Sequence, residues 1–259
     1  MIRTPNEEAL FPDSKASVLT RRLRALRGVL FDKDGTLFDF HASWRPVMER
    51  AARIAAGGHP ALAAALLQAG GYDSSSKTFQ ADSIIAAGHT GQLAEIWHSL
   101  GAVMDRDSLQ RRLDTLFSEE GPRDAVPVTD LPSLFTRLAE RGLALGIATN
   151  DGQEAAQATV RRFGLEEMLC FVAGYDSGHG SKPEPGMALA FCQTTGLSPH
   201  QVAMIGDNDH DMTSARVANL GVCIGVLSGT GDRSTLQDKA DVVLEDIAGL
   251  LNLLETAHV

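Results

Sequence analysis

Aspartates follow two short apolar runs of the kind that form buried strands. The first run, residues 28–32, leads into DKDGT (residues 32–36), and the second, residues 202–206, precedes Asp207, with Asp211 four residues later. Parallel strands present their carboxyl ends at one edge of a sheet, where such folds bind ligands, so these carboxylates are expected to converge. Two like charges at ~4 Å repel by about 4 kcal/mol at an effective dielectric of 20. The cluster therefore predicts a hard divalent cation, and carboxylate oxygens favour Mg²⁺.

Two further motifs supply hydrogen-bond donors and a positive charge. Thr149 and Asn150 close the apolar run 143–149, and Lys182 follows the glycine-containing loop 174–181. A hydroxyl, an amide and an ammonium group at the same edge are what a transferred phosphoryl group requires. We therefore expect Thr149 to donate a hydrogen bond to phosphate and Lys182 to neutralise charge.

The two aspartates of the first motif are expected to divide the chemistry between them. Asp32 is predicted to be the nucleophile, forming an aspartyl-phosphate, and one ligand of the metal. Asp34 is predicted to be the acid/base, which protonates the leaving oxygen and then activates water. Because a nucleophile must stay ionised and a general acid must hold a proton, the Asp34 carboxylate should point away from the metal.

The elements that position these residues alternate along the chain. Runs typical of buried strands occupy residues 28–32, 143–149, 169–173, 202–206, 221–227 and 241–244. Amphipathic helical spacing appears at 131–142 and 247–254, so a parallel sheet with right-handed crossovers is predicted. Residues 40–126 show helical spacing and no strand-like run, which predicts a helical insertion after the first strand.

Composition excludes several classes of function. The chain has 259 residues and a formal net charge of −10, which argues against a nucleic-acid binder. No apolar run approaches the ~18 residues of a membrane span, and Glu7, Glu8 and Asp13 interrupt the region of a signal peptide. Three cysteines without a CxxC spacing indicate neither a disulfide framework nor a zinc site. We expect a soluble cytoplasmic protein without nucleic-acid or membrane partners, either a monomer or a homodimer.

Four motifs in order resemble the haloacid dehalogenase superfamily of hydrolases. They are FDKDGT (31–36), ATN (148–150), SKPEP (181–185) and GDNDHD (206–211). The resemblance implies an α/β fold, with a Rossmann-like three-layer α/β/α core, a mainly parallel sheet and an inserted, mobile, all-helical cap. Its implied boundaries are an N-terminal extension with a short helix at 1–27, the core at 28–39 and 127–259, and the cap at 40–126.

The resemblance also implies roles for individual residues. Asp32, the backbone carbonyl of Asp34, Asp207 and Asp211 would bind Mg²⁺, the last directly or through water. Thr149 and Asn150 would hold phosphate, and Lys182 would pair with the nucleophile. The candidate substrate-binding residues are Asn150, Thr36, His179 and Arg45, where Arg45 could fork onto a substrate carboxylate and His179 could contact a carboxylate or phosphate.

The predicted reaction is hydrolysis of a small phosphomonoester, with 2-phosphoglycolate as the first candidate. Among the reactions of this superfamily, Asp34 argues against dehalogenation, because dehalogenases lack the second aspartate. Phosphonatases use a lysine of the cap, and since Lys77 is the single lysine of the insertion, a phosphonatase is not favoured. Thr36 favours a phosphatase over a β-phosphoglucomutase-like phosphomutase. The alternatives that remain are a phosphatase for a sugar phosphate or nucleotide, that phosphomutase, and a non-catalytic receiver-like module that is only phosphorylated.

Overall fold

A six-stranded parallel sheet forms the centre of the larger part of the protein. The computed structural model describes residues 15–258, and its sheet has the strand order β5-β4-β1-β6-β7-β8. Each neighbouring pair runs parallel, with Phe31 of β1 between Ile147 of β4 and Ile205 of β6. The strands are β1 (Gly28–Phe31), β4 (Ala144–Ala148), β5 (Phe171–Ala173), β6 (Val202–Gly206), β7 (Val222–Val226) and β8 (Val242–Leu244).

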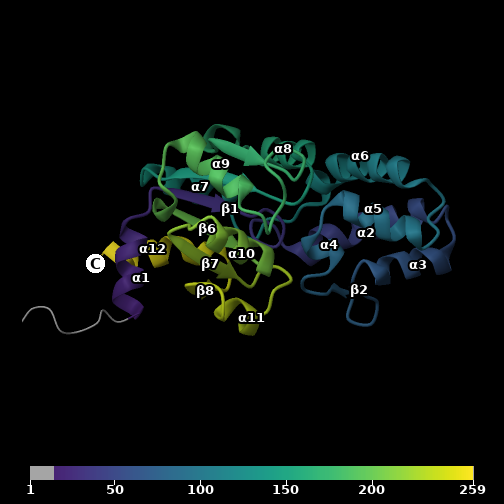
Figure 1. Ribbon diagram of the computed structural model, residues 1–259, viewed down its shortest axis with the longest axis horizontal. Helices are drawn as coiled ribbons and strands as arrows, with labels where there is room; N and C mark the ends of the chain where they lie inside the picture. The colour runs from purple at the N-terminus through teal and green to yellow at the C-terminus, as the bar shows by residue number, and fades with distance from the viewer. Residues whose placement is uncertain (1–14, 259) are drawn as a thin grey trace, which may run out of the picture.

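Helices cover both faces of this sheet (Figure 1). One face packs against α1 (Lys15–Arg24), α7 (Leu131–Glu140), α8 (Gln153–Arg162) and α12 (Leu250–His258). The other face packs against α9 (Gly186–Thr195), α10 (Asp209–Val217) and α11 (Arg233–Gln237). The parallel sheet predicted from alternating strands and helices is confirmed, and so is the three-layer α/β/α core that the family resemblance implies.

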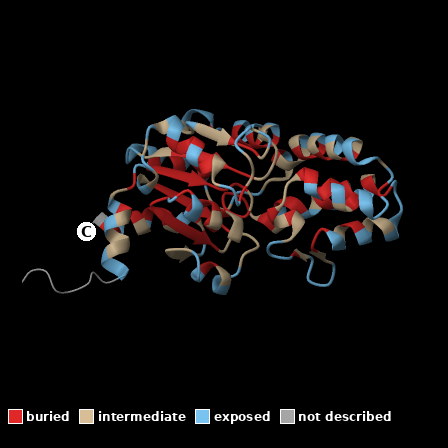
Figure 2. Ribbon diagram, viewed as in Figure 1, coloured by how far each residue is buried: buried red, intermediate tan, exposed pale blue. Residues whose placement is uncertain are grey.

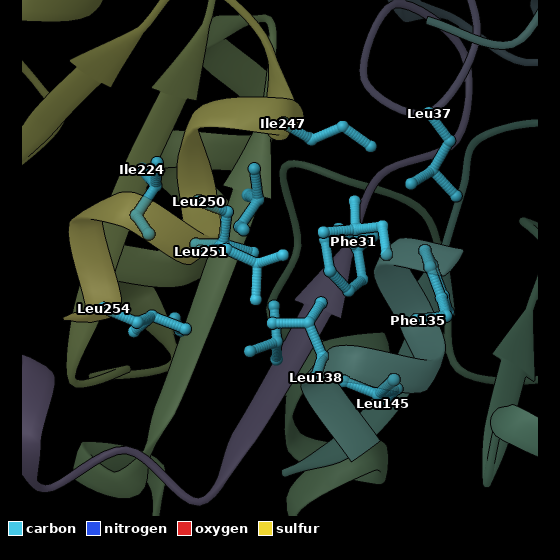
Figure 3. Packing of buried hydrophobic residues seen from close by; sticks show 14 of the residues in the cluster. Phe31, Leu37, Phe135, Leu138, Leu145, Ile224, Ile247, Leu250, Leu251 and Leu254 are labelled. Carbon is cyan, nitrogen blue, oxygen red and sulfur yellow. The ribbon is translucent and has the colours of Figure 1, made fainter. Parts of the chain in front are cut away.

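Alternation along the strands divides the apolar side chains between the two layers. Phe31 of β1 lies in the cluster with α7 and α12, whereas its neighbour Leu30 lies in the cluster with α9 and α10. Figure 3 shows Phe31 beside Phe135 and Leu138 of α7. The rings of Phe31 and Phe135 stack with their centroids 5.0 Å apart. Because successive strand residues point to opposite faces, a strand covered on both faces must be apolar throughout, as β1 is.

The insertion at residues 40–126 has its own hydrophobic cluster. Its helices are α2 (Phe40–Ala55), α3 (Pro60–Ala69), α4 (Ile84–Ala87), α5 (Thr90–Ser99) and α6 (Arg106–Asp124). They gather at one end of the molecule, opposite α1 and α12, and their buried faces turn toward one another (Figures 1 and 2). Trp97 is completely buried there, and Trp44 meets Phe117 edge to face with centroids 5.2 Å apart.

The insertion departs from an all-helical structure at one place. Two-residue strands β2 (Tyr72–Asp73) and β3 (Thr78–Phe79) pair antiparallel. Sequence reasoning missed this hairpin because its two strands, on either side of a serine-rich turn, are too short to show strand periodicity. The boundaries at 39/40 and 126/127 stay a prediction, and residues 1–14 of the expected N-terminal extension lie outside the described residues.

No helix among residues 15–258 is long and apolar enough to cross a membrane.

Candidate active site

Three neighbouring strands bring the predicted motifs to one edge of the sheet. Asp32 follows β1, Thr149 follows β4 and Asp207 follows β6. The ladder continues past β1, since the Asp32 backbone N–H donates to the Ile205 carbonyl at 2.8 Å. Their convergence therefore results from parallel pairing and register, as the sequence predicted.

Asp211 reaches the same edge through the start of a helix. Asn208 caps α10: its side-chain oxygen accepts from the His210 backbone at 2.9 Å and from the Asp211 backbone at 3.4 Å. The Asp211 carboxylate accepts in return from the Asn208 backbone at 3.2 Å. This reciprocal capping folds the first turn of α10 back toward β6. The Asp211 carboxylate therefore lies near that of Asp207, although the two residues are four positions apart in the sequence.

A buried carboxylate cluster results, with Lys182 beside it. Oxygens of Asp32, Asp207 and Asp211 lie within 4.8 Å of one another, and all three residues are buried. The Lys182 ammonium group contacts Asp32 at 2.5 Å and Asp211 at 2.6 Å. Three carboxylates thus face one ammonium group, and this excess of negative charge with all-oxygen donors fits a hard divalent cation.

Burial and like charge raise the pKa values of this cluster. Burial is the largest influence on Asp32 and raises the pKa of its carboxyl to about 7, although Lys182 opposes it. Burial, with Asp32 and Asp211, raises the pKa of Asp207 well above its usual range. Burial alone would lower the pKa of Lys182, but Asp211 and Asp32 outweigh it and raise that pKa. The protein alone therefore leaves the site short of positive charge.

The Asp34 carboxylate is held apart from this cluster. Lys33, itself buried, pairs with Asp34 at 2.7 Å and with Asp151 at 2.9 Å, and its ammonium group lies 5.5 Å from the Trp44 ring centroid. The carboxylates of Asp32 and Asp34 thus have different cationic partners. Sequence reasoning found Asp34 but missed Lys33 and Asp151.

Glycines allow the backbone to approach the carboxylates. Gly35 has φ +90°, and a Cβ there would lie 2.6 Å from Asp207 Cγ. A Cβ on Gly206 would lie 2.2 Å from Asp211 Cγ. No other residue fits either position without moving an acidic side chain.

The Asn150 side chain joins the site to the insertion. Its Nδ2 donates to the Lys182 carbonyl at 2.9 Å and to the Ala87 carbonyl at 2.8 Å, and its Oδ1 accepts from the Lys182 backbone at 2.8 Å. His210 Nδ1 lies 3.0 Å from the same Ala87 carbonyl and must donate, because a carbonyl only accepts. Both Nδ2 protons of Asn150 are engaged, so its side chain positions Lys182 and the insertion.

A cavity of about 590 Å³, its open mouth included, lies between this edge of the sheet and the insertion. Its floor includes Asp32, Asp34, Thr149 and Lys182. Its opposite wall comes from α2, α4, α5 and α6. The predicted catalytic side chains thus share one cavity.

Three predicted substrate-binding residues do not line this cavity. Thr36 is fully buried, and its hydroxyl lies 3.4 Å from the second oxygen of Asp32, so it contacts the predicted nucleophile instead. Arg45 is exposed on α2, and His179 is exposed in its loop with its ring 6.0 Å from that of Phe171. Arg45 was chosen for its place just past the first strand, and His179 for its place in the loop before Lys182. Neither place fixes the direction of a side chain.

The cavity also contains residues that the sequence did not single out for the site. His89 lines it, and its ring stacks on Tyr175 with centroids 4.8 Å apart. The Tyr175 hydroxyl accepts from Gln110 Nε2 at 3.2 Å. These contacts join a loop of the core to the insertion, and no local sequence signal could have revealed them.

A family profile matches most of the chain. The profile for haloacid dehalogenase-like hydrolases covers residues 26–219, which include all four motifs and the insertion. The chain belongs to this family. The resemblance inferred from the motifs is confirmed.

Curated relatives are similar to the chain in sequence, and a solved structure shares its fold. The chain is 28% identical to a phosphoglycolate phosphatase of Pasteurella multocida over 149 residues, which are 57% of this chain and 66% of that protein. It is 26% identical to a phosphoglycolate phosphatase of Xanthomonas campestris over 230 residues, 86% of this chain and 94% of that protein. The chain thus spans just under two thirds of the first relative. A hydrolase from Pseudomonas syringae shares the fold with a TM-score of 0.61, 23% identity and coverage of 88% and 98% of the two chains.

Proposed function

We propose that the protein is a Mg²⁺-dependent phosphomonoester hydrolase that acts through an aspartyl-phosphate at Asp32. One observation carries the proposal: Asp32 lies at the floor of the cavity, paired with Lys182 and beside two further buried carboxylates. Asp32, Asp207 and Asp211, with the backbone carbonyl of Asp34 as the family resemblance implies, would hold the metal. When bound, the metal supplies positive charge that keeps Asp32 ionised and favours an anionic substrate.

The side chains of the chain then carry out the reaction in two steps. An Asp32 oxygen bonds to phosphorus, and the ester oxygen leaves with a proton from Asp34. Asp34 next removes a proton from water, whose oxygen displaces Asp32 and releases phosphate. Lys182 and Thr149 stabilise the phosphoryl charge throughout. Lys33 positions Asp34 for both transfers through their 2.7 Å ion pair.

The insertion is proposed to act as a cap at residues 40–126. It forms the wall opposite the catalytic floor and is tied to it at Ala87 by Asn150 and His210. Closing such a wall excludes water and large esters, so a small phosphorylated metabolite is the proposed substrate. Because the curated relatives are named phosphoglycolate phosphatases, 2-phosphoglycolate is the first ester to test.

The test is phosphate release with Mg²⁺ and with EDTA. We expect turnover of p-nitrophenyl phosphate, a reactive and unselective ester, with Mg²⁺ only. Asp32→Asn should abolish it, while Asp238→Asn, an exposed aspartate outside the cavity, should retain it. Turnover by Asp32→Asn at the wild-type rate would refute the proposal, and a stable phosphoenzyme without turnover would instead favour the receiver-like alternative.

A further inference from the structure

The wall that the insertion contributes to the cavity is mostly apolar, with His89 and Thr90 as its polar side chains. Six large side chains from α2, α4, α5 and α6 line it, and each is at least nine-tenths buried: Phe40, Trp44, Met48, Ile85, Leu93 and Phe117. They belong to the insertion's own hydrophobic cluster. The group that meets this wall in the proposed reaction is the part of the ester left after phosphate is removed.

No arginine or lysine of the insertion lines the cavity, and residues 40–126 are described throughout. Arg50 pairs with Glu120 and Asp124 on the outside of the helices, and Arg45 is exposed. His89 is the one ionisable side chain that the insertion contributes, and burial, with Arg106 as a lesser influence, lowers its pKa. Burial thus disfavours the charged form of His89, so this side chain adds little positive charge to the wall.

The positive charge on the opposite side is already engaged. Lys182 lies against Asp32 and Asp211, and His210 Nδ1 donates to the Ala87 carbonyl. A carboxylate on the leaving group would lose water against the apolar wall without gaining a cation, which is unfavourable. An apolar leaving group loses nothing there and gains the burial of its surface.

We infer that this enzyme hydrolyses phosphomonoesters whose leaving group is uncharged and largely apolar, a primary alcohol with a branched alkyl or aromatic body. The inference rests on the proposed function and specifies its substrate class. The substrate class inferred for this chain differs from 2-phosphoglycolate, the substrate named for its curated relatives, because the leaving group of 2-phosphoglycolate carries a carboxylate.

A matched pair of esters tests it. Isobutyl phosphate and 2-phosphoglycolate have nearly the same size and both release a primary alcohol, but one carries an isopropyl group where the other carries a carboxylate. We expect kcat/KM with Mg²⁺ to be at least about tenfold higher for isobutyl phosphate. Benzyl phosphate, which buries more apolar surface, should be better still. Binding gives a second readout: benzylphosphonate should raise the melting temperature more than phosphonoacetate does.

A charge placed in the wall should reverse the preference. Met48→Lys puts an ammonium group into the cavity and is expected to lower the isobutyl-to-glycolate ratio by about tenfold or more. Met104→Lys is the matched control, since Met104 packs against the same hydrophobic cluster without lining the cavity. Its ratio should stay at the wild-type value, and circular dichroism and melting would confirm that both variants fold.

The outcomes separate the two proposals. If 2-phosphoglycolate equals or exceeds isobutyl and benzyl phosphate, the inference is wrong, while metal-dependent turnover keeps the proposed function. If Met48→Lys leaves the ratio unchanged in a folded protein, the wall does not face the leaving group, and the inference is again wrong. If no ester is hydrolysed, p-nitrophenyl phosphate included, the proposed function fails and the inference with it.

Discussion

Replacing Asp207 by asparagine should stabilise the metal-free protein. Asp207 is 1% exposed, and its carboxylate lies within 4.8 Å of oxygens of Asp32 and Asp211. At an effective dielectric of 20, one such pair repels by about 3.5 kcal/mol. Lys182 offsets part of this repulsion, and the raised pKa of Asp207 lets a proton relieve more. We expect Asp207→Asn to increase the free energy of unfolding by about 1–2 kcal/mol in EDTA.

The same substitution should remove the stabilisation by Mg²⁺. A ligand at 100 times its Kd stabilises the folded state by about 2.7 kcal/mol, and the variant loses one of the three carboxylates that would hold it. The asparagine keeps an acceptor for the Thr230 backbone N–H, which donates to Asp207 at 2.8 Å, so local structure is preserved.

Urea unfolding of wild type, Asp207→Asn and the exposed control Asp238→Asn, each in EDTA and in excess Mg²⁺, measures both effects. The control should stay within about 0.5 kcal/mol of wild type in each condition. If Asp207→Asn is less stable than wild type in EDTA, or if Mg²⁺ raises its free energy of unfolding as much as that of wild type, electrostatic repulsion does not dominate this site.

Three other predictions follow from separate features of the site. Burial raises the folded-state pKa of Asp32 to about 7, so between about pH 4 and 7 the metal-free folded state holds a proton that the unfolded state has lost. The contribution of Asp32 to stability should therefore fall as pH rises from about 4 to 7. The increase in melting temperature caused by Mg²⁺ should shrink as pH falls below 7, because the metal must displace this proton. The difference in unfolding free energy between wild type and Asp32→Asn, followed over pH in EDTA, measures the first effect, and a difference independent of pH would contradict it. Asn150→Ala removes three hydrogen bonds to Lys182 and Ala87, so it should lower the free energy of unfolding by about 1–3 kcal/mol and also lower kcat. The control Asn252→Ala, on the exposed surface of α12, should change that free energy by less than about 0.5 kcal/mol. Equal effects of the two substitutions would contradict the positioning role. Gly35→Ala should destabilise the protein by about 1–2 kcal/mol more than Gly58→Ala does, because both glycines have positive φ but only Gly35 has a carboxylate where the Cβ would lie; equal melting temperatures would refute this close-contact argument.

The sheet could be predicted because its sequence pattern is local. The runs at 28–31 and 202–206 are apolar throughout, which burial on both faces requires, and an aspartate follows each of them. Parallel pairing then brings Asp32, Thr149 and Asp207 to one edge without any further information. For this reason the sequence alone predicted the carboxylate cluster and Lys182.

Contacts between segments far apart in the chain could not be predicted in this way. The pairing of Lys33 with Asp151, the two donors on the Ala87 carbonyl and the stacking of His89 on Tyr175 join residues far apart in the chain. Helical periodicity reports which face of a helix is buried, but it does not report what that face meets. Arg45 was expected in the site for its charge, yet its position on α2 faces away from the buried stripe that lines the cavity.

Trapping the phosphoenzyme tests the central claim most directly. The wild-type protein would be mixed with a hydrolysed ester and Mg²⁺, quenched in acid within one turnover, and treated with borohydride, which reduces an aspartyl-phosphate to homoserine. Mass spectrometry of the peptide around residue 32 should then find homoserine in place of Asp32, and the Asp32→Asn protein should give none. Homoserine at another aspartate, or phosphate release by Asp32→Asn at the wild-type rate, would contradict the assignment of Asp32 as the nucleophile.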